Sequence, residues 1–155
     1  MDQSYIRLPE EKYELMGDYI AGFVEGEGCF SLSMYKDKRY AKGVQPYPSF
    51  TLQVHIIDLP LIKKIKKTLN CGRIYYNEER KIVNYKVYKR SDIVNKVIPF
   101  FDRYQFHGNK KKSFEIFKEI MNLLLLKKKL SDEDIAHLFY LKESMNSRED
   151  FDGEQ

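Results

Sequence analysis

The sequence reads IAGFVEGEG at residues 20–28, and this stretch decides how the chain is interpreted. Apolar residues recur at helical spacing through it and before it, which predicts a helix over about residues 10–25. A glycine inside a helix is unfavourable by roughly 1 kcal/mol relative to alanine, so Gly22 needs a reason. Gly26 follows four residues later on the same helix face, and small residues allow a second backbone to approach closely. We therefore expect Ala21, Gly22 and Gly26 to contact the same helix of a second subunit.

Two acids close the predicted helix. Glu25 and Glu27 stand at the negative pole of the helix dipole, where carboxylates are unfavourable. If two such helices pair, four carboxylates gather at one end of the pair, and a hard divalent cation with oxygen ligands relieves their repulsion. The alternative is a pair of exposed carboxylates that end a surface helix beside turn glycines.

Downstream of the glycines the hydrophobic period changes from that of a helix to that of strands. Alternation from Cys29 and again from Phe50 predicts two paired strands joined by a basic loop at residues 36–48. Asp58 is placed to cap a helix that ends near Leu69. The remaining expected elements are strands over about residues 73–78 and 82–89, and helices over about residues 92–103 (capped by Ser91), 110–128 and 132–145 (capped by Ser131).

This order predicts the α+β class, with one sheet of four antiparallel strands that helices cover on one face only. The length of 155 residues suits one domain, which we place at residues 1–146, followed by an acidic tail at 147–155 that we expect to be disordered. Two cysteines cannot form a disulfide framework, and neither has the neighbours of a zinc site. No apolar stretch has the length of a membrane span, so no membrane partner is expected.

Charge is unevenly distributed, although the net charge is only +4. Residues 1–30 carry seven acids and two bases, which gives −5, and residues 131–155 carry eight acids and two bases, which gives −6. Residues 31–130 carry 23 bases and eight acids, which gives +15. A basic middle suits phosphate binding. A solvated lysine-rich surface explains the charge alone equally well.

Together, the motif and the order of elements resemble the LAGLIDADG homing endonuclease family. The matching features are the Ala21-Gly22 pair, the apolar Phe23 and Val24, the acids Glu25 and Glu27, and the closing Gly28. The motif occurs once and precedes two hairpins separated by a helix, so the resemblance covers roughly residues 10–128. It points to the single-motif, homodimeric branch. It implies an αββαββα fold with a four-stranded antiparallel saddle sheet and C-terminal helices, in which the motif helices pair and each sheet enters the major groove of DNA.

The resemblance also implies a catalytic centre. Glu27 matches the acid that binds the catalytic metal, expected to be Mg²⁺ with Mn²⁺ as a substitute, and the carbonyl of Gly26 matches a further ligand. Glu25 matches the acid that stabilises the helix end and the interface. Glutamate replaces the family's usual aspartate at both positions. Lys110 matches the active-site lysine, and the two lysines that follow it are the alternative alignments.

Specificity is assigned to polar side chains on the open face of the sheet, because a two-stranded ribbon fits the major groove. Ile56 stands where many relatives have a polar residue near the active-site water, with His55 and Asp58 close by, so that polar role is absent or moved. His55 is expected to contact DNA, with a general-base role as the alternative. The predicted base-contacting residues are Ser31, Ser33, Tyr35, Thr51, Gln53, His55, Arg73, Tyr75, Asn77, Asn84, Lys86 and Tyr88. The predicted phosphate-contacting residues of the loop are Lys36, Lys38, Arg39 and Lys42.

The implied function is site-specific cleavage of double-stranded DNA by metal-dependent phosphodiester hydrolysis, at a long pseudo-palindromic target. Two alternatives use the same scaffold: an intron maturase that binds intron RNA, and a DNA-binding regulator without catalysis. A metal-independent interaction domain is a third. The resemblance also implies an intron-encoded protein of a mitochondrion or chloroplast, made there because the N-terminus lacks a targeting pattern.

Overall fold

Helix α1 (Gly17–Glu27) carries the motif. The computed structural model of the chain describes residues 16–39 and 43–147, and Met16 has an extended backbone immediately before the helix. The helix therefore begins at Gly17 and not near residue 10, and the earlier predicted residues lie outside the described ones. Ile20 and Val24, one turn apart, are fully buried and anchor α1 to the body of the protein. At its other end α1 passes directly into the sheet, without a loop.

The first hairpin pairs β1 (Gly28–Lys36) with β2 (Val44–His55) in antiparallel register. The prediction of a loop at residues 36–48 is wrong, because β2 already begins at Val44, which lies opposite Lys36. Two prolines, Pro46 and Pro48, made this part of β2 look like a loop. They are two residues apart, so their nitrogens face the same edge of β2. The ladder of β2 with β4 begins only at Phe50, so this edge is open where the prolines lie and no hydrogen bond is lost.

The second hairpin follows a helix, as predicted. A single turn, η2 (Ile56–Asp58), leads into α2 (Leu59–Leu69), and then come β3 (Arg73–Asn77) and β4 (Ile82–Val87). Asp58 occupies the capping position of α2, although its side chain makes no capping bond. The four strands form one antiparallel sheet in the order β1-β2-β4-β3, which leaves β3 as an edge strand.

Three helical segments run end to end after the sheet: α3 (Arg90–Asp92), the π-helical turn η3 (Ile93–Val97) and α4 (Ile98–Arg103). The run begins after Lys89, so the predicted cap at Ser91 is wrong. Pro99 has no N–H to offer the preceding turn, which fits the wider turn immediately before it. The chain ends in α5 (Lys110–Leu126) and α6 (Asp132–Asn146), which pack against each other. Ser131 opens α6 through a capping box with Asp134, as predicted.

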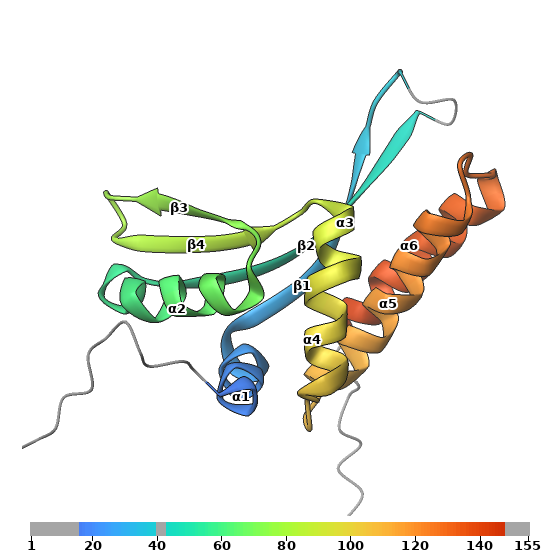
Figure 1. The fold of residues 1–155 in the computed structure, drawn as a ribbon. Helices are drawn as coiled ribbons and strands as arrows, with labels where there is room; N and C mark the ends of the chain where they lie inside the picture. The colour runs from blue at the N-terminus through green and yellow to red at the C-terminus, as the bar shows by residue number, and fades with distance from the viewer. Residues whose placement is uncertain (1–15, 40–42, 148–155) are drawn as a thin grey trace, which may run out of the picture.

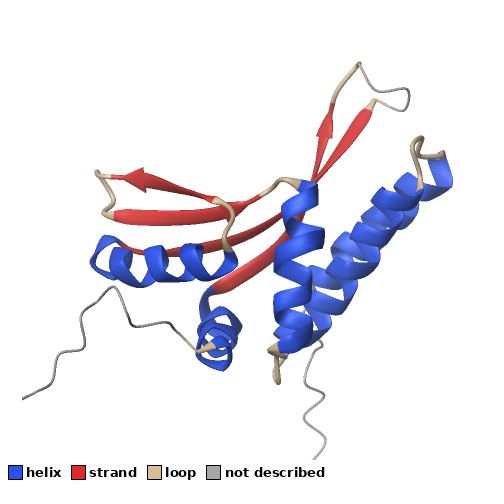
Figure 2. Ribbon diagram, viewed as in Figure 1, coloured by secondary structure: helices blue, strands red, loops and turns tan. Residues whose placement is uncertain are grey.

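All helices lie on one side of the sheet, and the other side is open (Figures 1 and 2). Phe30 lies at the centre of the interior, with Phe50, Phe114 and Phe117 within 5.1–5.3 Å between ring centroids. These rings join β1, β2 and α5 in one core, so the sheet and the C-terminal helices fold as a unit. The α+β class and the αββαββα order with C-terminal helices are confirmed. In the described part of the chain no helix is long and apolar enough to cross a bilayer.

Candidate functional site

Glu25 joins the end of the motif helix to the loop that precedes α5. Its Oε1 accepts hydrogen bonds from the backbone nitrogens of His107 and Gly108, both at 2.7 Å. A Cβ at residue 108 would lie 3.3 Å from the Glu25 carboxyl carbon, so glycine fits this close approach. The other oxygen, Oε2, is buried and has no hydrogen-bond partner among the described residues. Two amide dipoles thus compensate the unfavourable position of this acid at the helix end.

Lys110 begins α5 and reaches back to the same place. Its ammonium donates to the carbonyl oxygen of Gly28, the residue that follows α1. Lys110 is therefore held in position twice, because its side chain is bound to Gly28 and the loop before it is bound to Glu25. Lys111, the next residue along, is exposed. This geometry favours Lys110 for the role that the sequence assigns to it.

Glu27 is exposed at the end of α1 and borders a small pocket. The other polar side chains of this pocket come from Gln53, His55 and Asp58, at the end of β2 and the turn after it. Ile56 is partly buried and packs against the core, so the polar role expected there is absent at that position. From the sequence, Asp58 was predicted to cap α2 and was noted as a polar residue close to Ile56. Asp58 and Glu27 border the same pocket because α1 packs next to the end of β2, and no local sequence pattern reveals that packing.

His55 has one ring nitrogen already engaged. Nδ1 accepts a hydrogen bond from the backbone nitrogen of Ile57 at 3.1 Å. In the neutral ring the proton then sits on Nε2, which makes the free nitrogen a donor and not a base. The geometry therefore favours the DNA-contacting role of His55 over general-base catalysis.

The predicted base-contacting side chains share one face of the sheet. Across the strands Thr51 lies opposite Lys86, Gln53 opposite Asn84, and Asn84 in turn opposite Tyr75. The concave centre of this open face is a hollow of about 510 Å³. We call this face the saddle. Its hollow is lined by Ser33, Tyr35, Tyr47, Pro48, Ser49, Thr51, Gln53, Tyr75, Asn84, Lys86 and Tyr88.

Other predicted contact residues lie toward the rim of the saddle. Ser31 Oγ is 2.8 Å from Ser49 Oγ, so its hydroxyl is already engaged within the sheet. Arg73 lies opposite Lys86, and Asn77 lies opposite Ile82 near the end of β3. These rim positions face the same side as the hollow without lining it.

Sequence reasoning missed part of the saddle. Tyr47 is 42% exposed, and its ring packs against that of Tyr35 at 5.3 Å between centroids. Ser49 lies on the same face but is buried. The signal was present as alternation from Gln45 through Thr51, but the interleaved prolines led to the assignment of a loop.

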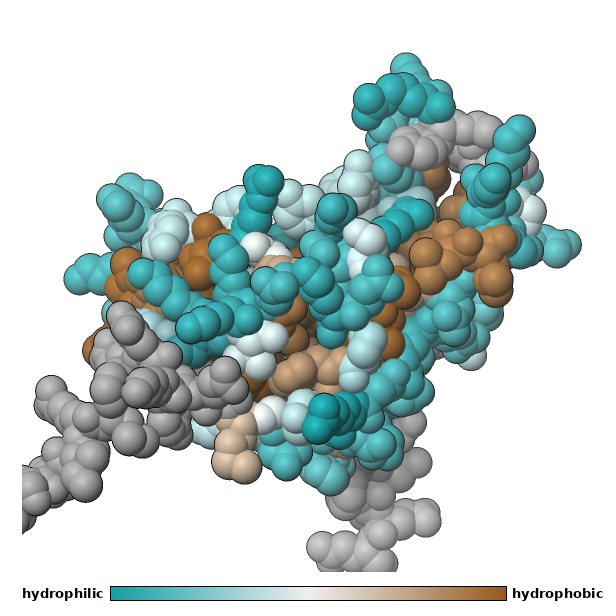
Figure 3. Space-filling view, viewed as in Figure 1, coloured by the Kyte–Doolittle hydropathy of each residue, from teal (hydrophilic) through white to brown (hydrophobic). Residues whose placement is uncertain are grey.

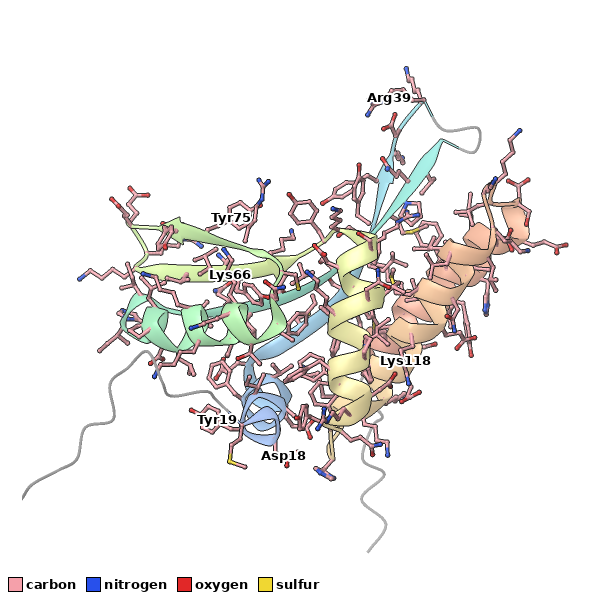
Figure 4. The ribbon with its side chains drawn as sticks, viewed as in Figure 1. Asp18, Tyr19, Arg39, Lys66, Tyr75 and Lys118 are labelled. Atoms are coloured by element: carbon pink, nitrogen blue, oxygen red, sulfur yellow. The ribbon has the colours of Figure 1, made fainter. Side chains whose placement is uncertain are left out.

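The tip of the first hairpin lies far from α1 (Figure 4). Lys36, Lys38 and Arg39 are exposed there, and Lys42 lies outside the described residues. Arg39 forms an ion pair with Asp37 at 2.8 Å, and this bonding lowers the pKa of the Asp37 carboxyl below its ordinary value. The tip therefore carries an arginine already matched by an acid beside two exposed lysines.

Among the described residues, none covers one face of α1. A Cβ built at Gly22 or at Gly26 meets nothing within 4 Å, and Tyr19 on the same helix is 53% exposed. Tyr19 and Asp18 point away from the body of the protein (Figure 4). Ala21 differs from the two glycines, because it is 3% exposed and packs in the core of its own subunit. The face open to a second backbone is therefore formed by Gly22 and Gly26 and not by Ala21.

Comparison with known proteins identifies this arrangement. The chain is 32% identical over 129 residues to the probable intron-encoded endonuclease 2 of Neurospora crassa, covering 83% of this chain and 27% of that protein. It is 30% identical over 113 residues to the probable intron-encoded DNA endonuclease 1 of Mycosarcoma maydis, covering 73% and 40% respectively. The chain thus spans between about a quarter and two fifths of these curated relatives.

Solved structures share the whole fold. The homing endonuclease I-TnaI superposes with a TM-score of 0.80 at 26% identity, covering 88% of this chain and 92% of that one. The LAGLIDADG homing endonuclease I-LtrWI, solved bound to its target DNA, superposes with a TM-score of 0.81 at 34% identity, covering 86% of this chain and 45% of that one. The LAGLIDADG endonuclease family model matches residues 20–121. The chain belongs to the LAGLIDADG endonuclease family.

Proposed function

We propose that this chain is a subunit of a site-specific DNA endonuclease that hydrolyses one phosphodiester bond in each strand. The observation that carries the proposal is the arrangement at the end of α1. There the exposed Glu27 borders a pocket that it shares with Gln53 of the saddle, and the Lys110 ammonium is bound to the carbonyl of Gly28, the residue after Glu27. The names of the relatives support this reading, since several are intron-encoded endonucleases and two of the solved relatives are bound to DNA.

The saddle reads the target. A sheet surface of this kind fits the major groove, where glutamine and asparagine recognise adenine edges and lysine recognises guanine. Gln53 lies opposite Asn84, and Lys86 follows two residues after Asn84 on the same face of β4, so these groups face adjacent base pairs. The hairpin lysines contact phosphates, which fix the register of the protein on the duplex without reading sequence.

The functional unit is a homodimer joined through α1. The exposed Gly22 and Gly26 leave room for a second backbone, and the orphan oxygen of Glu25 lies at the same helix end. I-TnaI, of which the chain covers 92%, has one such unit of comparable length, whereas the chain covers only 45% of I-LtrWI. A two-fold pair presents two saddles, so the target is long and pseudo-palindromic.

The metal site is shared between subunits. Within the described residues no group of three or more histidines, cysteines and acids could hold a metal ion. A Mg²⁺ site that uses one or two carboxylates and takes its other ligands from phosphates and water fits this chemistry. Glu27 and the carbonyl of Gly26 from each subunit provide the protein ligands, and Mn²⁺ can replace Mg²⁺. When bound, the ion supplies an activated water and charge neutralisation at the phosphate.

Lys110 has a separate part in the reaction. Its ammonium is a compact positive charge held beside the scissile phosphate by the Gly28 carbonyl. It stabilises the negative charge that grows on the phosphoryl oxygens as the bond breaks. Glu25 contacts no reacting atom, and it positions the loop that carries Lys110.

The gene context follows from the relatives' names, which describe intron-encoded proteins. We place the gene in an intron of a mitochondrial or chloroplast genome, with the protein made in that organelle. Intron insertion sites of such genomes are then the source of candidate target sequences.

The test is cleavage of a plasmid library of intron-insertion-like sites in magnesium, with wild type, Glu27→Gln and the control Glu78→Gln. Glu78 is an exposed acid in the turn between β3 and β4. We expect site-specific double-strand cuts by wild type and the control, and binding without cuts by Glu27→Gln. Binding without cutting by all three would establish a DNA-binding regulator, and selective binding of intron RNA would establish a maturase.

A further inference from the structure

Helix α2 concentrates positive charge on its solvent side. Its eleven residues include Lys63, Lys64, Lys66 and Lys67 and no acid. Lys66 and Lys67 lie in the last turn, where the helix dipole favours cations, but lysines three and four positions apart also repel each other. A ligand of opposite sign would relieve that repulsion.

Three of these lysines line a groove between α2 and the edge strand β3. The groove has a volume of about 790 Å³ and also receives Arg73 and Tyr76, the latter 54% exposed. Its lining contains four cations and no acid. Within the described part of the chain, no ion pair or hydrogen bond is recorded for the ammonium groups of Lys63, Lys66 or Lys67. Hydrophilic side chains gather over α2 in Figure 3.

This α2–β3 groove is continuous with the saddle. Tyr75 lines both the groove and the hollow of the saddle. Arg73 lines the groove and lies opposite Lys86 on the saddle face. Figure 4 shows Lys66 on α2 and Tyr75 on β3, on the two sides of this sheet edge. The α2–β3 groove and the saddle therefore meet at β3, through Arg73 and Tyr75.

The width of the sheet tells where this edge lies on a duplex. Neighbouring strands are about 4.8 Å apart, so four strands span about 14 Å between the outer two. The major groove is about 12 Å wide and is bordered by the two phosphate backbones. An edge strand of a sheet in that groove therefore lies against a backbone. Cations immediately beyond the edge lie within reach of phosphates and cannot reach base edges.

We propose that the α2–β3 groove binds the phosphate backbone of the target duplex, with Lys63, Lys66 and Lys67 as its contacts. The inference rests on the proposed function, because it needs a duplex in the saddle. It extends the interface to the helix-covered side of the sheet and adds affinity that is independent of sequence. None of these three lysines lines the pocket of Glu27, so replacing them tests backbone binding without changing the proposed catalytic residues.

The test measures how affinity depends on salt. The variant replaces Lys63, Lys66 and Lys67 by Gln, and the matched control replaces the same three by Arg, which keeps the charges. Binding to a duplex that wild type cuts, and to a scrambled duplex of equal length, is titrated without divalent metal at several salt concentrations. For B-DNA each lost phosphate contact makes the slope of log K against log [salt] less steep by about 0.9. Circular dichroism confirms that both variants are folded.

We expect the Gln variant to lose up to three such contacts and the Arg variant to keep the wild-type slope. In the Gln variant, binding to the target duplex and binding to the scrambled duplex should weaken by the same factor. Cleavage at saturating protein stays at the wild-type rate. An unchanged slope in the Gln variant overturns the proposal, and so does a loss confined to the target duplex, which would indicate base reading. Loss of binding to single-stranded RNA with duplex binding intact also overturns it. If no duplex is found that wild type cuts, the proposed function fails before this test can be made.

Discussion

A single carboxylate, Glu25, connects three parts of the site. It closes the motif helix, fixes the loop at residues 107–108 and thereby sets where α5 begins. Together with the bond from the Lys110 ammonium to the Gly28 carbonyl, these two hydrogen bonds hold Lys110 at the end of α1. The resemblance assigns Glu25 to the helix end and the interface, and in the fold its carboxylate also binds the loop before α5.

Replacement of Glu25 by alanine is expected to lower the free energy of unfolding. Hydrogen bonds to a charged acceptor contribute about 1.5–3 kcal/mol each, and partial exposure of Glu25 reduces the effect, so the expected total loss is about 2 kcal/mol. Glu25→Gln keeps an acceptor oxygen and should lose less. Urea unfolding monitored by circular dichroism measures both. Glu143→Ala, at an exposed position on α6, is the control, and equal stability of Glu25→Ala and this control would contradict the role.

Lys110 is proposed to act in catalysis and not in binding. On that proposal Lys110→Met removes the charge assigned to the scissile phosphate, so single-turnover cleavage should fall by about 10²–10³, the range found when one transition-state stabiliser is removed. The affinity for target DNA should change little. Lys111→Met, at the exposed next position, is the matched control. A similar loss of cleavage in both variants would show that general basicity, and not the anchored ammonium, matters.

At the scale of elements, α6 depends on an acid whose state is fixed by its neighbours. Lys127 donates to Asp134 at 2.8 Å and Ser131 donates its backbone N–H at 2.9 Å, which together lower the pKa of Asp134 to about 2. The ordinary value is about 3.9, so this carboxylate favours the folded state above that pH and loses its contribution as pH falls toward 2.

The thermal midpoint of the wild type should therefore fall more steeply than that of Asp134→Asn between about pH 5 and pH 2. The variant lacks the titrating group and starts from a lower midpoint. Melting curves at several pH values in this window measure the difference. Glu133→Gln, at an exposed position in the same turn, should keep the wild-type slope. Parallel curves for wild type and Asp134→Asn would contradict the assignment.

The elements also show what a sequence can and cannot reveal. Alternation located β1, β3 and β4, and the capping box located α6, because these signals depend on neighbours along the chain. The start of β2 was missed because Pro46 and Pro48 normally exclude a central strand, and only the length of β4 shows that this edge is open. The start of the helix at Arg90 was missed because Ser91 looked like a cap while the true capping position is Lys89.

The same limit applies to the site at the scale of the whole molecule. The motif indicated Glu25, Glu27 and Gly26, since all three lie in one continuous stretch. That Asp58 borders the pocket of Glu27, and that backbone amides at residues 107–108 bind Glu25, depends on contacts between segments far apart in sequence. The motif alone did not show that Ala21 is buried in its own subunit while Gly22 is exposed, because packing between distant segments decides which face of the helix meets the core.

At the scale of the whole molecule, the proposed reaction requires two subunits. A single subunit presents one Glu27 and one saddle, so it cannot cut both strands by the proposed scheme. Gly22→Leu tests this requirement. A Cβ built at Gly22 meets no described residue within 4 Å, so a leucine fits the single subunit. Replacing a glycine inside a helix also stabilises that helix by several tenths of a kcal/mol or more. The folded subunit should remain, but the leucine should keep the partner helix away.

We expect wild type to sediment as a dimer, and Gly22→Leu to sediment as a folded monomer without double-strand cleavage. Sedimentation equilibrium over a range of concentrations measures this, with circular dichroism as the check on folding. Ala136→Leu places the same side chain at an exposed position of α6 and should leave the dimer intact. A dimer that persists in Gly22→Leu would show that the subunits meet through another surface. A wild type that stays monomeric at all concentrations would contradict the proposed homodimer.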